Sequence, residues 1–127
     1  MRVSWNQKDN NYLATINLNQ KTVNIIDIRF PMLSVAELVG HQENVNCIGW
    51  SPESRYMIAS GGEDSQTHIF DLSKSTQSQN PMHTENYPID PILLYSAESP
   101  IVNLQWPKNH PGWIGIAFDM KIQLLKI

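Results

Sequence analysis

Hydrophobic residues along the chain fall into short runs, and polar turn clusters separate one run from the next. In the run 45–50 (VNCIGW), β-branched and aromatic residues dominate and successive positions alternate between two faces, as in a half-buried strand. The clusters 17–20, 51–54, 61–65 and 107–112 are predicted turns, because Gly permits positive φ, Pro fixes φ and Asn or Asp binds its own backbone. No segment has a competing helical period, so the pattern predicts an all-β fold.

Three segments of the chain repeat one order of strand-like runs. Each begins with a run that ends in Trp, and its closing run has a polar penultimate residue 20 to 22 positions later. The tryptophans are Trp5, Trp50 and Trp106, and the closing residues are Asp27, Asp71 and Lys126. Further strand candidates, 34–38 and 92–97, lie between the segments. Units of about four short antiparallel strands at this spacing are typical of the blades of a β-propeller.

The expected organisation is one partial propeller over residues 1–127, with blades at roughly 1–38, 39–97 and 98–127. Segment 73–91 interrupts the rhythm, because it is polar and contains three Pro residues, and we predict a long, mobile surface loop there. The last blade has no candidate for a fourth strand. We therefore expect a fragment of a larger ring, whose open blade takes a strand from elsewhere, with a genuinely short protein as the alternative.

Composition and charge narrow the function classes. The chain has 127 residues, 41% of them hydrophobic, which is typical of a single globular domain. Its formal net charge is −3 and no Lys/Arg cluster occurs, which argues against direct binding of nucleic acid. No apolar run approaches the roughly 18 residues that span a membrane. The single cysteine, Cys47, forms no internal disulfide, which favours a reducing compartment, and we expect it in the core.

The second repeat unit carries a dense set of motif residues, which resembles the WD repeat in order, spacing and type. The matching positions are Gly40-His41, Val45, Ile48, Trp50, Ser51-Pro52, Ala59 to Asp64 and Ile69-Phe70-Asp71. The resemblance implies an antiparallel WD-repeat β-propeller, in which His41, Ser60 and Asp64 form a structural hydrogen-bond network. Phe70 stands where the family has Trp and brings no N–H donor, so the network has three members. The first and third units match the motif less well.

Catalytic chemistry has little support in the sequence. His41, Ser60 and Asp64 have the residue types of a hydrolase triad, but the WD-repeat alignment accounts for them as structural residues. The four His residues lack metal-ligand spacing and Cys47 has no pairing cysteine. His68 is expected to be a surface or hydrogen-bonded histidine. We therefore predict no enzyme activity, no metal and no cofactor.

A closer resemblance covers nearly the whole chain. It rests on the strings VSWNQKDNNYLAT, NIIDIR, VNCIGWSP, DPILLYSAES, VNLQW and PGWIGIAF. These are similar to the C-terminal third of the transparent-testa-glabra-like, anthocyanin-regulatory WD-repeat adaptors, whose animal members are cullin ligase-associated factors. The resemblance implies about three blades of a seven-bladed ring of about 300 residues. It also implies a scaffold in the cytoplasm and nucleus that binds transcription regulators of the basic-helix-loop-helix and MYB types, protein kinases or a cullin-RING ligase adaptor.

Candidate docking residues follow from the same resemblance. In WD-repeat substrate receptors of cullin-RING ubiquitin ligases, a Trp-Asp-x-Arg box ends the third strand and its Arg binds the ligase adaptor. Here the box reads Ile26-Asp27-Ile28-Arg29, so Arg29, with Asp27 beside it, is a docking candidate, and an ordinary solvated Arg is the alternative. Trp113 begins a strand after a loop and is a candidate interface anchor or a core residue.

Two other sets of aromatic residues complete the candidates. Phe30-Pro31-Met32 and Tyr87-Pro88 place large apolar groups near loops, where interface anchors occur. Trp5, Trp50 and Trp106 recur in register, so we expect them in the core of their blades. A ligand-binding or enzymatic propeller with a site in the funnel remains the alternative function. It requires ionisable residues clustered at one opening, whereas those of this chain are scattered.

Overall fold

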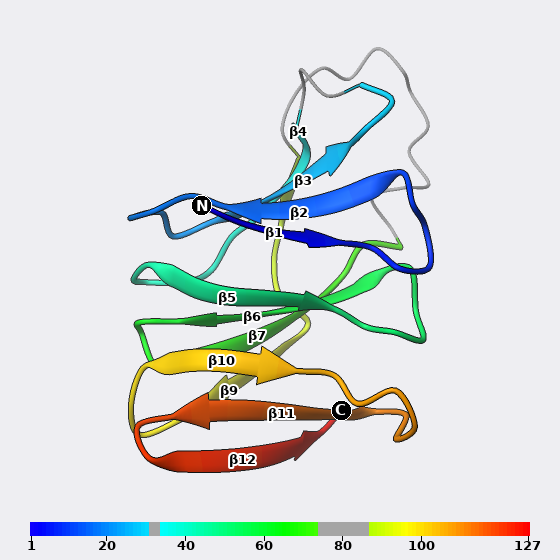
Figure 1. Ribbon diagram of the computed structural model, residues 1–127. Helices are drawn as coiled ribbons and strands as arrows, with labels where there is room; N and C mark the ends of the chain where they lie inside the picture. Colours follow the sequence, from blue (N-terminus) through cyan, green and yellow to red (C-terminus); the bar gives the residue numbers. More distant parts are fainter. Residues whose placement is uncertain (31–33, 74–86) are drawn as a thin grey trace.

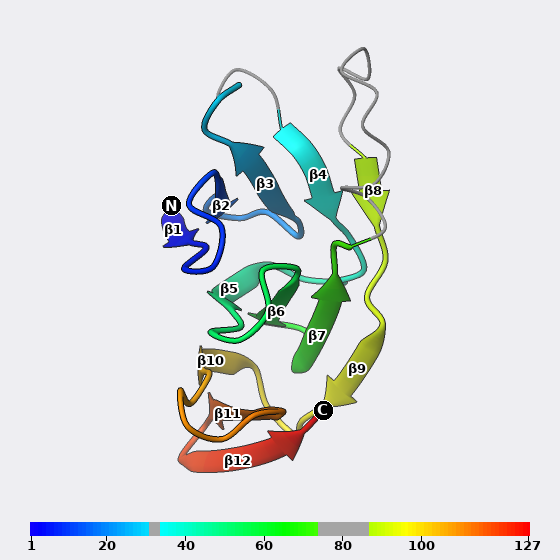
Figure 2. The ribbon, with the colours of Figure 1, turned by 90° about the vertical axis from the view of Figure 1, so that its right-hand side faces the viewer.

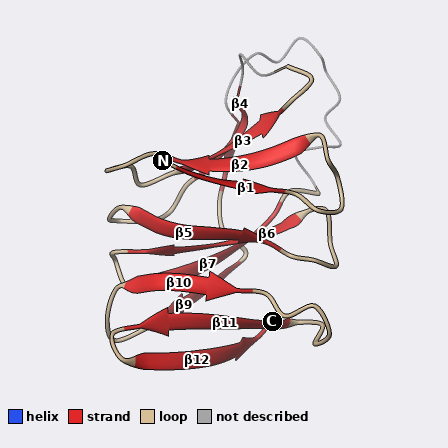
Figure 3. Ribbon diagram, viewed as in Figure 1, coloured by secondary structure: helices blue, strands red, loops and turns tan. Residues whose placement is uncertain are grey.

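The computed structural model describes residues 1–30, 34–73 and 87–127, and every regular element in these ranges is a β-strand (Figures 1 and 3). The described part of the chain holds no helix that could cross a membrane. The strands are β1 (Arg2–Trp5), β2 (Tyr12–Ile16), β3 (Val23–Asp27), β4 (Ser34–Leu38), β5 (Val45–Trp50), β6 (Met57–Gly62), β7 (Gln66–Asp71), β8 (Tyr87–Ile89), β9 (Leu93–Ser96), β10 (Ile101–Gln105), β11 (Trp113–Phe118) and β12 (Lys121–Lys126).

The strands form three sheets that follow one another along the stack in Figure 1. The first has the order β1-β2-β3-β4-β8, the second β5-β6-β7-β9 and the third β10-β11-β12. Neighbouring strands are antiparallel except β4 and β8. In Figure 2 the first strand of each sheet, β1, β5 or β10, lies along one side of the stack. The prediction of an all-β, antiparallel partial propeller is confirmed.

Equivalent turns in the three sheets share an unusual backbone conformation. The turns β2–β3, β6–β7 and β11–β12 each contain one non-glycine residue with positive φ. These residues are Asn19 (φ 62°), Ser65 (φ 66°) and Asp119 (φ 53°). Asn and Asp tolerate this region because their short side chains hydrogen-bond to the local backbone. The repeat seen in the sequence is therefore also a repeat of turn geometry.

The core consists of two hydrophobic layers, one on each face of the second sheet. The first layer joins the first and second sheets and includes Ile25, Leu38, Ile58 and Phe70, each at most 1% exposed. The second layer joins the second and third sheets and is built around Ile101, Ile114 and Ile116. Strands β6 and β7 are buried on both faces, whereas β1 and β12 are largely exposed. The second sheet is thus the best-packed part of the described chain.

The predicted mobile loop 73–91 needs a correction at its C-terminal end. Strand β8 lies within it and pairs in parallel with β4, so the chain crosses from the second sheet to the first before returning as β9. The Val39 N–H donates to the Ile89 carbonyl over 3.0 Å, and Ile89 packs against the first core layer. This pairing satisfies edge groups of β4 that would otherwise be open. The rest of the predicted loop, 74–86, lies outside the described residues.

Candidate functional site

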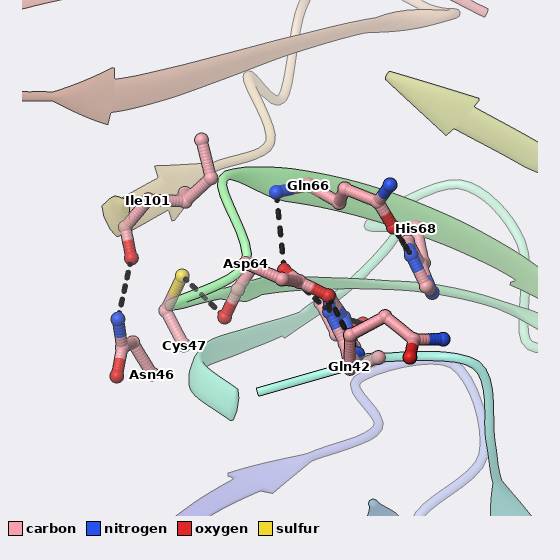
Figure 4. A network of polar contacts seen from close by, with 10 residues as sticks. Gln42, Asn46, Cys47, Asp64, Gln66, His68 and Ile101 are labelled. Carbon is pink, nitrogen blue, oxygen red and sulfur yellow. Dashed lines mark hydrogen bonds and ion pairs between the residues drawn. The ribbon is translucent and has the colours of Figure 1, made fainter. Parts of the chain in front are cut away.

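The second sheet holds a buried polar network at one end (Figure 4). His41 precedes β5, Ser60 lies in β6, and Asp64 occupies the turn between β6 and β7. His41 Nδ1 lies 2.9 and 3.0 Å from the two carboxylate oxygens of Asp64, and its Nε2 lies 2.8 Å from Ser60 Oγ. Because a carboxylate only accepts, Nδ1–H donates to Asp64 and Nε2 accepts from the Ser60 hydroxyl. The structure thus brings the three network residues together.

Electrostatics hold this network in one protonation state. Burial lowers the pKa of His41, and the adjacent Asp64 carboxylate only partly opposes the effect. Burial alone would raise the pKa of Asp64, but donors from Gln42, His41 and Gln66 lower it overall. The backbone N–H groups of Gln42 and Gln66 donate to the carboxylate over 2.9 and 3.1 Å. A neutral imidazole facing an ionised carboxylate results, and it ties the segment before β5 to the β6–β7 turn.

A second histidine extends the network and was not predicted as part of it. The ring of His68 stacks on that of His41, with centroids 3.8 Å apart and planes only 6° from parallel. Its Nε2 donates to Gln66 Oε1 over 2.9 Å, while its Nδ1 is buried and has no hydrogen-bond partner in the described structure. Burial, followed by the neighbouring His41, lowers the pKa of His68 to about 4, although Asp64 opposes the shift.

The network does not suit a metal ion or a nucleophilic reaction. His41, Asp64 and His68 offer ligand atoms within 4.8 Å of one another, but a metal at about 2.0 Å must lie near the plane of each imidazole that binds it. Two stacked, nearly parallel rings share no such point. Ser60 is fully buried, so no substrate reaches its hydroxyl. Cys47 is also buried, and burial raises the pKa of its thiol to about 11. The geometry supports a structural role.

Arg29 and Asp27 form an ion pair at the end of β3. Asp27 accepts hydrogen bonds from the Arg29 backbone N–H (3.0 Å), Nε (2.9 Å) and Nη2 (2.7 Å). Hydrogen bonding from Arg29 lowers the pKa of Asp27. The Arg29 side chain is 54% exposed and that of Asp27 only 6%. The buried carboxylate of Asp27 therefore orients the exposed Arg29 guanidinium, and the docking role of the two residues stays a prediction.

The other predicted docking residues lie elsewhere on the molecule. Trp113 begins β11 opposite Lys126 in the third sheet, is 38% exposed, and belongs to a different sheet from Arg29. Phe30 is 63% exposed. The adjoining Pro31 and Met32, and the side chain of Tyr87, lie outside the described structure.

Two of the three repeated tryptophans donate hydrogen bonds from one sheet to the sheet before it. Trp50 Nε1 donates to the Ser4 carbonyl in the first sheet (3.0 Å), and Trp106 Nε1 donates to the Gly49 carbonyl in the second (2.9 Å). Trp5 donates instead to the Asn10 carbonyl in its own hairpin loop. Trp50 is 7% exposed, but Trp5 is 51% exposed, so its predicted core position is wrong. The difference arises because no described sheet lies beyond the first to receive the Trp5 indole.

Comparison with known proteins gives one match to a single repeat and others to longer parts of the chain. Residues 32–71 match the WD40 family model, described as WD domain, G-beta repeat. The chain is 41% identical over 128 residues to the DDB1- and CUL4-associated factor 7 homolog of Dictyostelium discoideum, a match that covers all of this chain and 36% of that protein. It is 39% identical over 79 residues to cell division cycle 20.6, cofactor of APC complex, of Arabidopsis thaliana, covering 62% of this chain and 17% of that protein.

A third relative is polyadenylation factor subunit 2 of Schizosaccharomyces pombe, which is 31% identical over 78 residues. That match covers 61% of this chain and 15% of the relative. The chain thus spans about a third or less of the length of these relatives.

Proposed function

This chain contains a WD40 repeat that spans β4 to β7 of a partial β-propeller, and from that premise we propose that it is a non-catalytic scaffold for regulatory proteins. Propeller blades hold their connecting loops on a rigid base, which suits binding to other proteins. The WD-repeat relatives include a protein named for its association with DDB1 and CUL4 and a cofactor of the APC complex.

The partner that we propose first is a DDB1-type adaptor of a CUL4 ubiquitin ligase, bound through Arg29. The observation that carries this proposal is the Arg29–Asp27 pair, in which a buried carboxylate fixes an exposed guanidinium at the end of a strand. A guanidinium held in this way loses little side-chain entropy when it binds a carboxylate or carbonyl on a partner. Transcription regulators, protein kinases and a location in the cytoplasm and nucleus remain proposals from the family resemblance.

Capture of purified DDB1 by the immobilised chain tests the proposal. Arg29→Ala should abolish capture. Arg29→Lys keeps the positive charge but loses the planar set of N–H donors of the guanidinium, so it should weaken capture strongly. Arg55→Ala is the matched control, because Arg55 is also exposed and should leave capture unchanged. Thermal melting of each variant shows whether it is folded. Capture by a folded Arg29→Lys variant at the original affinity would refute the role of Arg29.

The alternative of an enzymatic or ligand-binding funnel has less support. A groove of about 230 Å³ lies between the ends of β1, β5 and β10, where a funnel site would be expected. Lys108 is the one charged residue among those that line it. General acid–base catalysis requires a titratable donor and acceptor near the reacting atoms, and this groove does not bring such a pair together.

A further inference from the structure

The Arg29–Asp27 ion pair lies beside a tyrosine of the neighbouring strand. In the antiparallel pairing of β2 with β3, Tyr12 is the direct partner of Asp27 (Figure 1). Directly opposed residues carry their side chains on the same face of a sheet, with Cβ atoms about 4.5–5.5 Å apart. That face is the one turned toward the second sheet, because Tyr12 packs against the first core layer. The Tyr12 ring and the Asp27 carboxylate are therefore neighbours on the inner face of the first sheet.

The position of Tyr12 relative to Arg29 is fixed by the sheet and by the core. Tyr12 is the first residue of β2, and its side chain is half-buried against the first core layer. The pairing of the two strands continues past Asp27, because the Ile28 N–H donates to the Asn11 carbonyl over 2.8 Å. Arg29 follows directly. The chain is thus still tied to β2 where the guanidinium begins.

The electrostatics of Tyr12 show that its hydroxyl lies near both members of the ion pair. Burial, followed by the Asp27 carboxylate, raises the pKa of Tyr12, whereas Arg29 opposes the increase through its charge and a hydrogen bond. Asp27 accepts from Nε and Nη2 of Arg29. A guanidinium has five N–H donors, so it can bind the phenolic oxygen as well as the carboxylate.

We propose that Tyr12 is a positioning residue of the adaptor-docking site, which holds the Arg29 guanidinium against Asp27 before the partner binds. The proposal rests on the docking role of Arg29 proposed above and adds a second holding group to it. A side chain that already has its bound conformation loses less entropy when it binds. Arg29 is still 54% exposed, so its remaining N–H donors are open to a carboxylate or a backbone carbonyl of the adaptor.

Two measurements on the variant Tyr12→Phe test the proposal, because Phe keeps the ring and its packing but loses the hydroxyl. In the free chain, solvent exchange of the Arg29 Nε–H, measured by NMR, should become about threefold faster or more, since the guanidinium leaves Asp27 more often. The affinity for purified DDB1 should fall about fivefold, as for the loss of one hydrogen bond.

Tyr56→Phe is the matched control. Tyr56 is also half-buried against the first core layer, but its ring lies 4.9 Å from the Arg55 guanidinium carbon, so its hydroxyl has no part in holding Arg29. Both the exchange rate and the DDB1 affinity should change less than about twofold in this variant. Thermal melting of each variant shows that it is folded.

Unchanged Arg29 exchange in a folded Tyr12→Phe variant would overturn the proposal, even if DDB1 binding weakened, because the hydroxyl would then contact the partner itself. Faster exchange with unchanged DDB1 affinity would also overturn it, provided that Arg29→Ala abolishes capture. If Arg29→Ala captures DDB1 normally, the ligase proposal fails, and the exchange rate in the free chain still decides whether Tyr12 holds Arg29. The two failures are thereby distinguished.

Discussion

The stacked histidines should make the stability of this protein fall steeply in weak acid. The perturbation is protonation of His68, whose pKa is about 4 in the folded chain against a usual value of 6.5. Between these values the unfolded chain binds more protons than the folded one, so the contribution is present above pH 6.5 and is lost as pH falls. At pH 4.5 the unfolded imidazole is almost fully protonated and the folded one only to about a quarter. The His68 contribution to the free energy of unfolding should therefore drop by about 2.5 kcal/mol between pH 7 and pH 4.5.

Urea denaturation followed by tryptophan fluorescence at pH 7, 6, 5 and 4.5 measures this drop. His68→Phe keeps an aromatic ring against His41, removes the unpaired Nδ1 and cannot take up a proton. The variant should therefore lose about 2.5 kcal/mol less than the natural sequence over the same pH range. His41, Asp27 and Asp64 titrate in both proteins, so the difference between the two curves isolates His68. Parallel curves for the two proteins would refute the reasoning.

Two further substitutions test the contacts between sheets. Gly61→Ala should lower the free energy of unfolding in urea by about 1–3 kcal/mol, because the added Cβ would lie 2.5 Å from Ile101 Cγ2. Gly115→Ala is the control: its Cβ would lie 3.6 Å from the nearest atom, Leu124 Cδ2, so the substitution should be nearly neutral. Trp106→Phe removes the indole donor to the Gly49 carbonyl and should cost about 1 kcal/mol or more. Trp5→Phe is the control, because it removes only a hydrogen bond within one exposed hairpin loop and should cost less. An equal loss of unfolding free energy in the Trp5→Phe and Trp106→Phe variants would contradict the role of the inter-sheet bond.

The sequence predicted the features of the fold that depend on local pattern. Strand periods and turn residues placed the repeat units, and the resemblance to the WD repeat predicted the network of His41, Ser60 and Asp64. Period and turn chemistry are local, so a single sequence contains them. Strand β8 depends on its pairing with the distant strand β4. The polar composition of segment 73–91 predicted a loop there, so this strand was missed.

Side-chain environments at the candidate sites were harder to predict. Nothing in the spacing of His41 and His68 shows that their rings stack, because the contact joins β7 to the segment before β5. Nothing in the order Asp27-Ile28-Arg29 shows that the Asp27 carboxylate is buried and pairs with Arg29, because its burial depends on packing around the end of β3. The exposed face of Trp5 likewise depends on which sheet lies next to it, although its repeat position matches that of Trp50.

The tryptophan hydrogen bonds also have a direction along the chain. In both inter-sheet bonds the acceptor carbonyl, in Ser4 or Gly49, precedes its donor in the sequence. During synthesis on the ribosome the N-terminal part emerges first, and structure forms in that order. When each tryptophan leaves the ribosome, the strand that carries its acceptor carbonyl has therefore already been synthesised. The inter-sheet bonds can thus form in the order of synthesis, one repeat after another.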